Sequence, residues 1–221
     1  MDTAYVINLK HRTDRWQKIQ EDFKDAPFKL ERYDAIKVGD PPHYATQGTY
    51  ALFYTHQKII QEAKERGDKT LLIMEDDAMP CKDYGKRWTL IKKYLDSHLD
   101  EWGVFNGGVY DTLQLVKNPQ SIVDSETPVV LFDIMRGAAG QFLYFNIDAI
   151  HEKVKNWEDY QKFECDAYYV THHKSVGCIP FLAVQHDGDS DIENKPREWV
   201  YKFGLEEQFL KMKLNKYIRR K

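Results

Sequence analysis

The chain has 221 residues, of which 42% are hydrophobic, 14% are aromatic and 30% are charged. This length and composition exclude a largely disordered protein and suit one large α/β domain or two small ones. The formal net charge is −3 at pH 7, without the basic excess that marks nucleic-acid-binding proteins, so we expect no nucleic-acid partner.

The cysteine pattern and the N-terminus bear on the cellular compartment. Cys81, Cys165 and Cys178 are spaced like neither a zinc ribbon nor a disulfide framework, which favours reduced thiols. The N-terminal segment reaches charged residues too early for a signal peptide, and no apolar run approaches the ~20 residues of a membrane span. We therefore expect a location in the cytoplasm, either the organism's own or that of a host cell, whether the chain is whole or a domain of a longer protein.

Hydrophobic periodicity in the first half predicts alternating strands and helices. Strands are expected at residues 3–9, 28–36, 69–74 and 102–105, and helices around residues 16–23, at 49–66 and at 84–99. Gly67 supplies a stop for the second of these helices. Such alternation is typical of a parallel, Rossmann-like sheet, so the predicted fold class is α/β.

The second half has a less regular pattern. Strands are expected at 113–116, 129–132, 141–145 and 177–184, and helices at 148–157 and 166–173. In the absence of internal repeats, we predict a single domain over residues 1–195. Its central sheet should be mixed but mostly parallel, and flanked by helices.

The C-terminal segment, residues 196–221, forms a separate element in this prediction. Its apolar residues recur at helical spacing, and residues 195–221 contain nine Lys or Arg and three Glu. A basic amphipathic helix can lie on an anionic membrane surface. Packing of its apolar side onto the domain is the commoner outcome, and we prefer it while keeping peripheral membrane contact open.

The chemistry is expected at Glu75-Asp76-Asp77, which directly follows the apolar strand Leu71–Met74. In open α/β sheets, ligands bind outside the carboxyl ends of the strands. Because alternate strand residues share a side, Glu75 and Asp77 should face one cleft while Asp76 turns away. Two converging carboxylates favour Mn²⁺ or Mg²⁺, which would also neutralise a departing diphosphate. The alternatives are a solvated acidic loop and a cap for the following helix.

Three sequence blocks resemble glycosyltransferase family 25 in order and approximate spacing. They are VINLKHRTDRW at 6–16, GTYALFYTH at 48–56 and LLIMEDDAMP at 71–80. In the middle block Ala51 stands for a glycine and Thr55 for a serine of the family pattern. The resemblance implies a GT-A fold and inverting transfer of a hexose from a nucleotide diphosphate sugar, with UDP-galactose or UDP-glucose favoured. The implied acceptor is a hydroxyl on a glycan or on a hydroxylated protein.

The resemblance also implies which residues contact the nucleotide sugar. The residues that would face the base are Ile7, Asn8 and Leu9. Arg12 or Arg15 would contact phosphate or ribose, and the alternative for each is a surface pair with an acid such as Asp14. His56 matches a family histidine, although a core histidine on an amphipathic helix is a comparable interpretation. Glu75 and Asp76 would complete the contacts with the donor and its cation.

Two further residues are candidates for catalysis and metal binding. Asp166 matches a family aspartate and is the expected general base, with Asp77 serving the leaving group through the metal. The alternative role of Asp166 is a helix N-cap. By resemblance, His186 would join Glu75 and Asp77 as a metal ligand, unless it is an idle loop residue. Small residues at 136–140 would let the backbone approach a sugar, or simply form a turn before an edge strand.

Two other functions are alternatives to glycosyl transfer. A non-catalytic carbohydrate-binding or nucleotide-sugar-binding module could keep the same fold without turnover. A nucleotidyltransferase or phosphohydrolase would share the carboxylates at the sheet end, but it would need a Gly-rich or more basic phosphate cradle than this sequence offers. The leading prediction is a metal-dependent hexosyltransferase.

Overall fold

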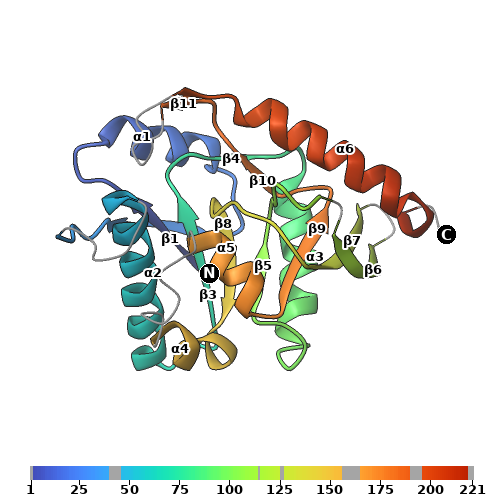
Figure 1. Ribbon diagram of the computed structural model, residues 1–221, viewed down its shortest axis with the longest axis horizontal. Coiled ribbons are helices and arrows are strands. Elements are labelled where there is room, and N and C mark those ends of the chain that lie inside the picture. The colour runs from blue at the N-terminus through green and yellow to red at the C-terminus, as the bar shows by residue number, and fades with distance from the viewer. Residues whose placement is uncertain are drawn as a thin grey trace.

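The computed structural model describes residues 2–39, 46–113, 115–124, 127–155, 165–189 and 196–218 (Figure 1). The strands of the main sheet are β1 Thr3–Asn8, β2 Lys29–Asp34, β3 Thr70–Glu75, β5 Val104–Asn106, β6 Val116–Asp124, β7 Thr127–Ile134, β8 Phe142–Asn146 and β9 Ser175–Ile179. Short strands pair separately as β4 Ala78–Pro80 with β10 Ala183–Gln185, and as β11 Gly188–Asp189 with β12 Pro196–Arg197. The helices are α1 Thr13–Asp22, α2 Gln47–Arg66, α3 Tyr84–Asp96, α4 Ile147–Lys155, α5 Cys165–His172 and α6 Trp199–Ile218.

The eight-stranded sheet has the order β2-β1-β3-β8-β5-β9-β7-β6. β1 pairs in parallel with β2 and β3, and β5 pairs in parallel with β9. The other four pairings, on β8 and β7, are antiparallel. Six of the eight strands therefore run in one direction, and only β7 and β8 run against them. This arrangement confirms the predicted α/β class with a mixed, mostly parallel sheet.

The central strands are apolar along their whole length because helices cover both faces of the sheet. On one face, Ile19 of α1 and Trp88 of α3 pack with alternate residues of β1, β3 and β8. On the other face, Phe53 and Ile60 of α2 pack with the remaining residues of these strands, together with α4 and α5. Gly67 ends α2 in the left-handed conformation with φ of 80°, as its position predicted.

The sequence misplaced two strands of the second half. A strand was expected at 113–116, but the observed strand, β6, begins only at Val116. Leu113 and Leu115 are exposed and precede it, and the polar residues 117–121 of β6 lack the alternating pattern that predicts a strand. The strand expected at 177–184 is divided between β9 and β10. β9 ends at Ile179 because the next residue, Pro180, has no N–H to donate to a neighbouring strand. The chain then turns into β10, which pairs with β4 directly after the acidic triplet.

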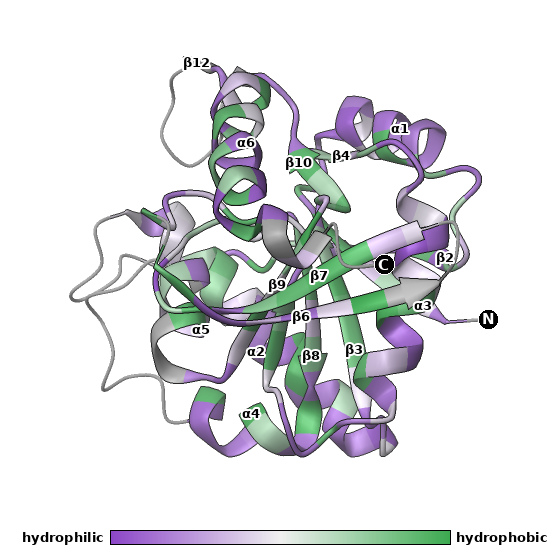
Figure 2. Cartoon of the chain, turned by 90° about the vertical axis from the view of Figure 1, so that its right-hand side faces the viewer, coloured by the Kyte–Doolittle hydropathy of each residue, from purple (hydrophilic) through white to green (hydrophobic). Residues whose placement is uncertain are grey.

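Helix α6 lies against β6, β7, β9 and β10, outside the main helical layers (Figure 2). Phe203, Leu210 and Leu214 are buried and join a core cluster with residues of β7 and β9. The helix thus packs on the domain through one apolar face. Across the described ranges, no helix has the combined length and apolarity to cross a bilayer.

Candidate functional site

A cavity of about 1050 Å³ opens at the carboxyl ends of β1, β2 and β3. Its lining includes Ile7 of β1, Leu9 after β1, Ile36 after β2 and the acidic triplet that begins with the last residue of β3. The first turns of α2, the segment before β8 and residues 185–188 form its walls. The volume is at the upper end of the range for pockets that enclose small molecules. The cavity therefore lies at the sheet edge where the sequence placed the ligand.

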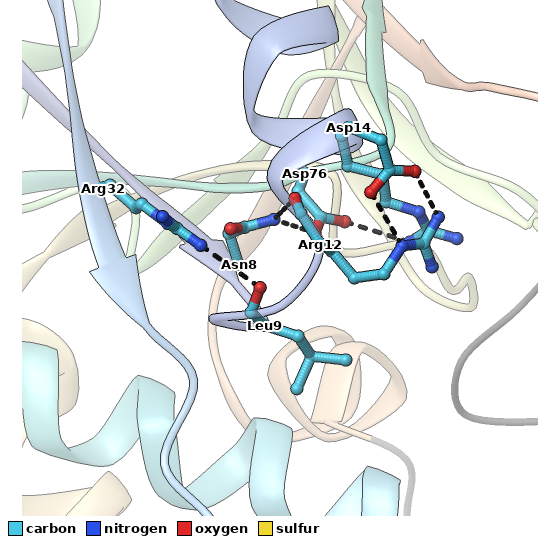
Figure 3. A network of polar contacts seen from close by, with 7 residues as sticks. Asn8, Leu9, Arg12, Asp14, Arg32 and Asp76 are labelled. Carbon is cyan, nitrogen blue, oxygen red and sulfur yellow. Dashed lines mark hydrogen bonds and ion pairs between the residues drawn. The ribbon is translucent and has the colours of Figure 1, made fainter.

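The parallel pairing of β1 and β3 brings Asn8 next to Asp76. Ile7 is in register with Glu75, so the following residues leave the two strands side by side. Asn8 Nδ2 donates to Asp76 Oδ2 over 2.6 Å, and Arg15 Nη1 donates to Asp76 Oδ1 over 3.0 Å (Figure 3). Burial raises the pKa of Asp76, while Arg15 and Asn8 oppose the rise. Asp76 lines the cavity with its two neighbours and ties the β1–α1 turn to β3.

Both predicted arginines line the cavity, and each already has a carboxylate partner. Arg12 donates to Asp14 through Nε over 3.1 Å and through Nη2 over 3.0 Å. This hydrogen bonding lowers the pKa of Asp14 to about 2. The Asp14 side chain is 65% exposed, whereas the Asp76 side chain that pairs with Arg15 is 10% exposed. The surface-pair interpretation thus describes Arg12, and Arg15 belongs to a buried network.

Glu75 lies against the backbone of Gly140, in the segment before β8. A Cβ on residue 140 would stand 2.1 Å from Glu75 Oε1, so only glycine fits there without a shift. Although solvent reaches Glu75 through the cavity, surrounding protein atoms desolvate the carboxylate and raise its pKa well above the ordinary value. The charges of Asp77, Asp166 and Asp76 raise this pKa further. Four carboxylates therefore act on one another at this end of the sheet.

Asp77 is held by the neighbouring hairpin. The register of β4 and β10 places Gln185 opposite Ala78, and the Gln185 side chain hydrogen bonds to the Asp77 carboxylate. Asp77 Oδ1 is buried and has no hydrogen-bond partner within the described part of the chain. Burial first, and then the charge of Asp76, raises the Asp77 pKa to about 6. The protein thus leaves part of the negative charge of Glu75 and Asp77 uncompensated.

Asp166 lies in the first turn of α5 and lines the same cavity. Its Oδ2 accepts from the Ala139 N–H over 2.5 Å, and its Oδ1 accepts from the Ala167 N–H over 2.8 Å. The first bond fixes Ala139, whose φ is 99°, next to Gly140 and Glu75. Asp166 is therefore held beside the segment that contacts Glu75, and its charge raises the Glu75 pKa. Its second bond is to the first turn of its own helix.

His186 does not complete a metal site with Glu75 and Asp77. Its Nε2 lies 2.7 Å from Oδ2 of Asp22, at the end of α1. The structure, over the residues it describes, contains no group of three or more His, Cys, Asp or Glu side chains arranged to hold a metal ion. The expected three-residue ligand set is therefore not formed. The sequence could not indicate that His186 pairs with Asp22, because the two residues are 164 positions apart and no local pattern links them.

His56 is also not a ligand contact in this structure. The side chain is 0% exposed, lies outside the cavity lining, and stacks on Tyr169 with ring centroids 5.6 Å apart. Neither ring nitrogen has a hydrogen-bond partner in the described regions, and burial lowers the His56 pKa to about 3. The structure supports the interpretation of His56 as a core residue, although that interpretation expected its ring nitrogens to be hydrogen bonded within the described residues, and they are not.

The segment 136–140 precedes β8, which is a central strand of the sheet and not the edge strand that was expected.

Sequence reasoning missed the aromatic corner of the cavity. Tyr110 and Trp199 both line it, with ring centroids 5.4 Å apart and planes at 78°. Lys202 lies over both rings, 4.8 Å from the Trp199 centroid. The two aromatic residues belong to distant segments that only the fold brings together, so no spacing could have revealed the pair.

Comparisons with known proteins give matches among solved structures alone. No family model and no curated protein sequence matches the chain. Among solved structures, it is similar to the crystal structure of a glycosyltransferase involved in the glycosylation of the major capsid of PBCV-1. The match covers 76% of this chain and 72% of that chain, with a TM-score of 0.44 and 13% sequence identity. At this level of similarity, function has to be inferred from the cavity itself.

Proposed function

We propose that the chain is a glycosyltransferase that moves a hexose from a nucleotide diphosphate sugar to a hydroxyl of a glycan or protein acceptor. UDP-galactose and UDP-glucose are the favoured donors. The observation that carries the proposal is the meeting of Glu75, Asp77 and Asp166 on one cavity at the carboxyl ends of parallel strands. Its volume of about 1050 Å³ leaves room for a nucleotide sugar and part of an acceptor.

The acidic cluster fits a divalent cation, Mn²⁺ or Mg²⁺. The pKa values of Glu75 and Asp77 are raised, and Asp77 Oδ1 has no hydrogen-bond partner among the described residues. A positive charge next to these carboxylates would therefore stabilise their ionised forms. Both ions prefer oxygen ligands and accept one or two carboxylates, with the remaining positions taken by phosphate oxygens and water. A bound cation would supply charge neutralisation for the leaving diphosphate. His186 is no longer needed in this ligand set.

Arg12 is the proposed contact of the diphosphate. Its guanidinium lies at the cavity wall and pairs with Asp14, whose side chain is 65% exposed, and such a surface pair contributes little in water. A phosphate can take the place of Asp14 on the same planar fork of donors. Arg15 has the different task of holding Asp76, because both partners are largely buried. The cavity wall at α1 thus carries two guanidinium groups. Arg12 can exchange Asp14 for a phosphate, and Arg15 stays paired with Asp76.

Asp166 is the proposed general base for the acceptor. In an inverting displacement, the acceptor oxygen bonds to the anomeric carbon as the bond from that carbon to the diphosphate breaks. The hydroxyl proton passes to the Asp166 carboxylate, and the electron pair of the broken bond leaves with the diphosphate. The Ala139 and Ala167 N–H groups hold this carboxylate in place at the cavity.

A panel of nucleotide diphosphate sugars, each with and without Mn²⁺, tests the proposal. A donor present at about 100 times its Kd should add about 2.7 kcal/mol to the unfolding free energy. Release of the free nucleotide diphosphate, assayed on the same panel, then reports turnover. Cation-dependent binding with turnover supports transfer. Binding without turnover, on any acceptor offered, supports a non-catalytic nucleotide-sugar-binding module instead.

A further inference from the structure

The exposed apolar side chains of this protein are concentrated in one region. The large ones in the described ranges are Tyr54, Leu113, Leu115, Met135, Val200, Tyr201, Phe209 and Met212. All except Tyr54 belong to α6 or to two loops that join it. Thr112 Oγ1 donates to Glu206 of α6, and Leu115 O accepts from the Met135 N–H over 3.0 Å. We call these seven side chains the apolar patch.

Helix α6 has a second apolar face that the fold does not use. Its inner face, with Phe203, Leu210 and Leu214, is buried in the domain. On the outer face, Tyr201 is 66% exposed, Phe209 is 49% exposed and Met212 is 76% exposed. At about 100° per residue, these three side chains fall within an arc of about 80°. Exposed apolar side chains that gather on one face of a helix indicate an interaction surface.

Basic residues flank the patch. Lys202 and Lys213 lie about 20–40° beyond Phe209 on the helix wheel, toward the loop that carries Leu113. The two acidic residues of α6 are engaged elsewhere. Glu206 accepts from Thr112, and Glu207 accepts from the Phe181 N–H and pairs with Lys211. The sequence continues beyond α6 with two arginines and a lysine. The patch therefore combines apolar side chains with net positive charge.

We propose that the apolar patch docks on an anionic lipid surface. Tyr201, Phe209 and Met212 enter the boundary between headgroups and acyl chains, and the flanking lysines contact the headgroups. Charge complementarity selects this occupant, because lysines beside an apolar stripe suit a negatively charged bilayer. Trp199, the first residue of α6, lines the cavity together with Tyr110, so the helix that carries the patch begins at the cavity wall. This inference goes beyond the proposed function and does not depend on it.

Vesicle flotation of the full chain tests the docking. The protein should bind vesicles of phosphatidylcholine that contain about 30% phosphatidylglycerol, and should bind pure phosphatidylcholine vesicles much less. Raising NaCl to about 0.5 M should release most of it, because salt screens the lysines. The triple variant Tyr201→Ser/Phe209→Ser/Met212→Ser should bind at least about tenfold less. The matched control Tyr54→Ser, an exposed aromatic on α2, should bind like the wild type.

A second variant and a measurement of the oligomeric state test the same docking proposal. Lys202→Ser/Lys213→Ser should lower binding to anionic vesicles and leave the weak binding to neutral vesicles unchanged. The proposal is overturned if the wild type ignores anionic vesicles, or if the folded triple variant binds as well as the wild type. It is also overturned if light scattering finds a dimer that the triple variant dissociates while vesicles bind neither protein. Vesicle binding needs no sugar donor, so its failure is separate from failure of the glycosyltransferase proposal.

Discussion

Asn8 and Asp76 join the ends of two parallel strands through a buried hydrogen bond of 2.6 Å. Arg15 binds the other oxygen of the same carboxylate, so one side chain holds β1, α1 and β3 together. Asp76 thus has a structural role, and Glu75 and Asp77 remain the proposed cation ligands.

Asp76→Ala should lower the unfolding free energy by about 1–3 kcal/mol, because two buried donors lose their acceptor. Chemical denaturation measures this loss directly. Asp14→Ala is the matched control, since it also removes an acid that pairs with an arginine of α1, but at an exposed position. The control should unfold like the wild type. Equal destabilisation by the two variants would contradict the structural role of Asp76.

Gly140→Ala should damage the site more than the fold. The new Cβ would stand 2.1 Å from Glu75 Oε1, so the carboxylate or the backbone before β8 must move. We expect cation-linked donor binding to weaken at least about tenfold, on the scale of a displaced charged hydrogen bond. Gly204→Ala, at an open position of α6, is the control and should bind donor normally. Titration calorimetry with both variants decides the point.

The stability of the cation-free protein should fall as pH rises through the titration range of Asp77. Its pKa is raised from 3.8 to about 6 in the fold. Between these values the native state keeps a proton that the unfolded chain has lost, so the unfolding free energy decreases with rising pH. The loss is complete above about pH 6. Added Mn²⁺ should restore stability at pH 7.5 and have little effect at pH 5.

The variant Asp77→Asn isolates this titration from others in the same range. His56, with a pKa lowered to about 3, has the opposite sign, because the unfolded state binds its proton first as pH falls. The difference between wild type and Asp77→Asn therefore reports the Asp77 titration together with its effect on Glu75, whose pKa the Asp77 charge raises. A pH-independent difference, with the same response to Mn²⁺, would remove Asp77 from the proposed cation site.

Asp166→Asn should reduce turnover by about 10²–10⁴-fold while donor affinity stays nearly constant, because the base touches the acceptor and not the diphosphate. Asparagine can still accept the Ala139 N–H through its oxygen and is a competent N-cap, so the fold should survive. Steady-state kinetics and donor binding are to be measured on the same preparation. Full turnover in this variant would assign Asp166 to helix capping alone.

The sequence was most informative where burial leaves a periodic signal. The apolar run of β3 could be predicted as a central strand with the acidic triplet at its carboxyl end. The orientation of the three acids could not, because β3 ends at Glu75, and Asp76 and Asp77 lie in the following turn, where strand alternation does not apply. α2 could be predicted as well, because its apolar face and Gly67 mark both its side and its end. β6 could not, since it carries Asn118, Pro119 and Gln120 in place of alternation.

Contacts between distant residues were beyond the sequence. The pairing of His186 with Asp22 and that of Asn8 with Asp76 span 164 and 68 positions, and neither follows from local periodicity. His56 shows a different limit. Helical spacing places it on the inner side of α2, but both a core histidine and a ligand contact can face inward. Only its distance from the cavity separates the two.

The most direct test of the central claim is nucleotide diphosphate release from UDP-galactose and UDP-glucose with Mn²⁺, compared between the wild type and Asp77→Ala. If the cavity is a glycosyl-transfer site, the wild type releases UDP and transfers the sugar to an acceptor. EDTA or Asp77→Ala should abolish the release without unfolding the protein. Undiminished release by the variant or in EDTA would contradict the account, as would the absence of donor binding and release across the whole sugar-nucleotide panel.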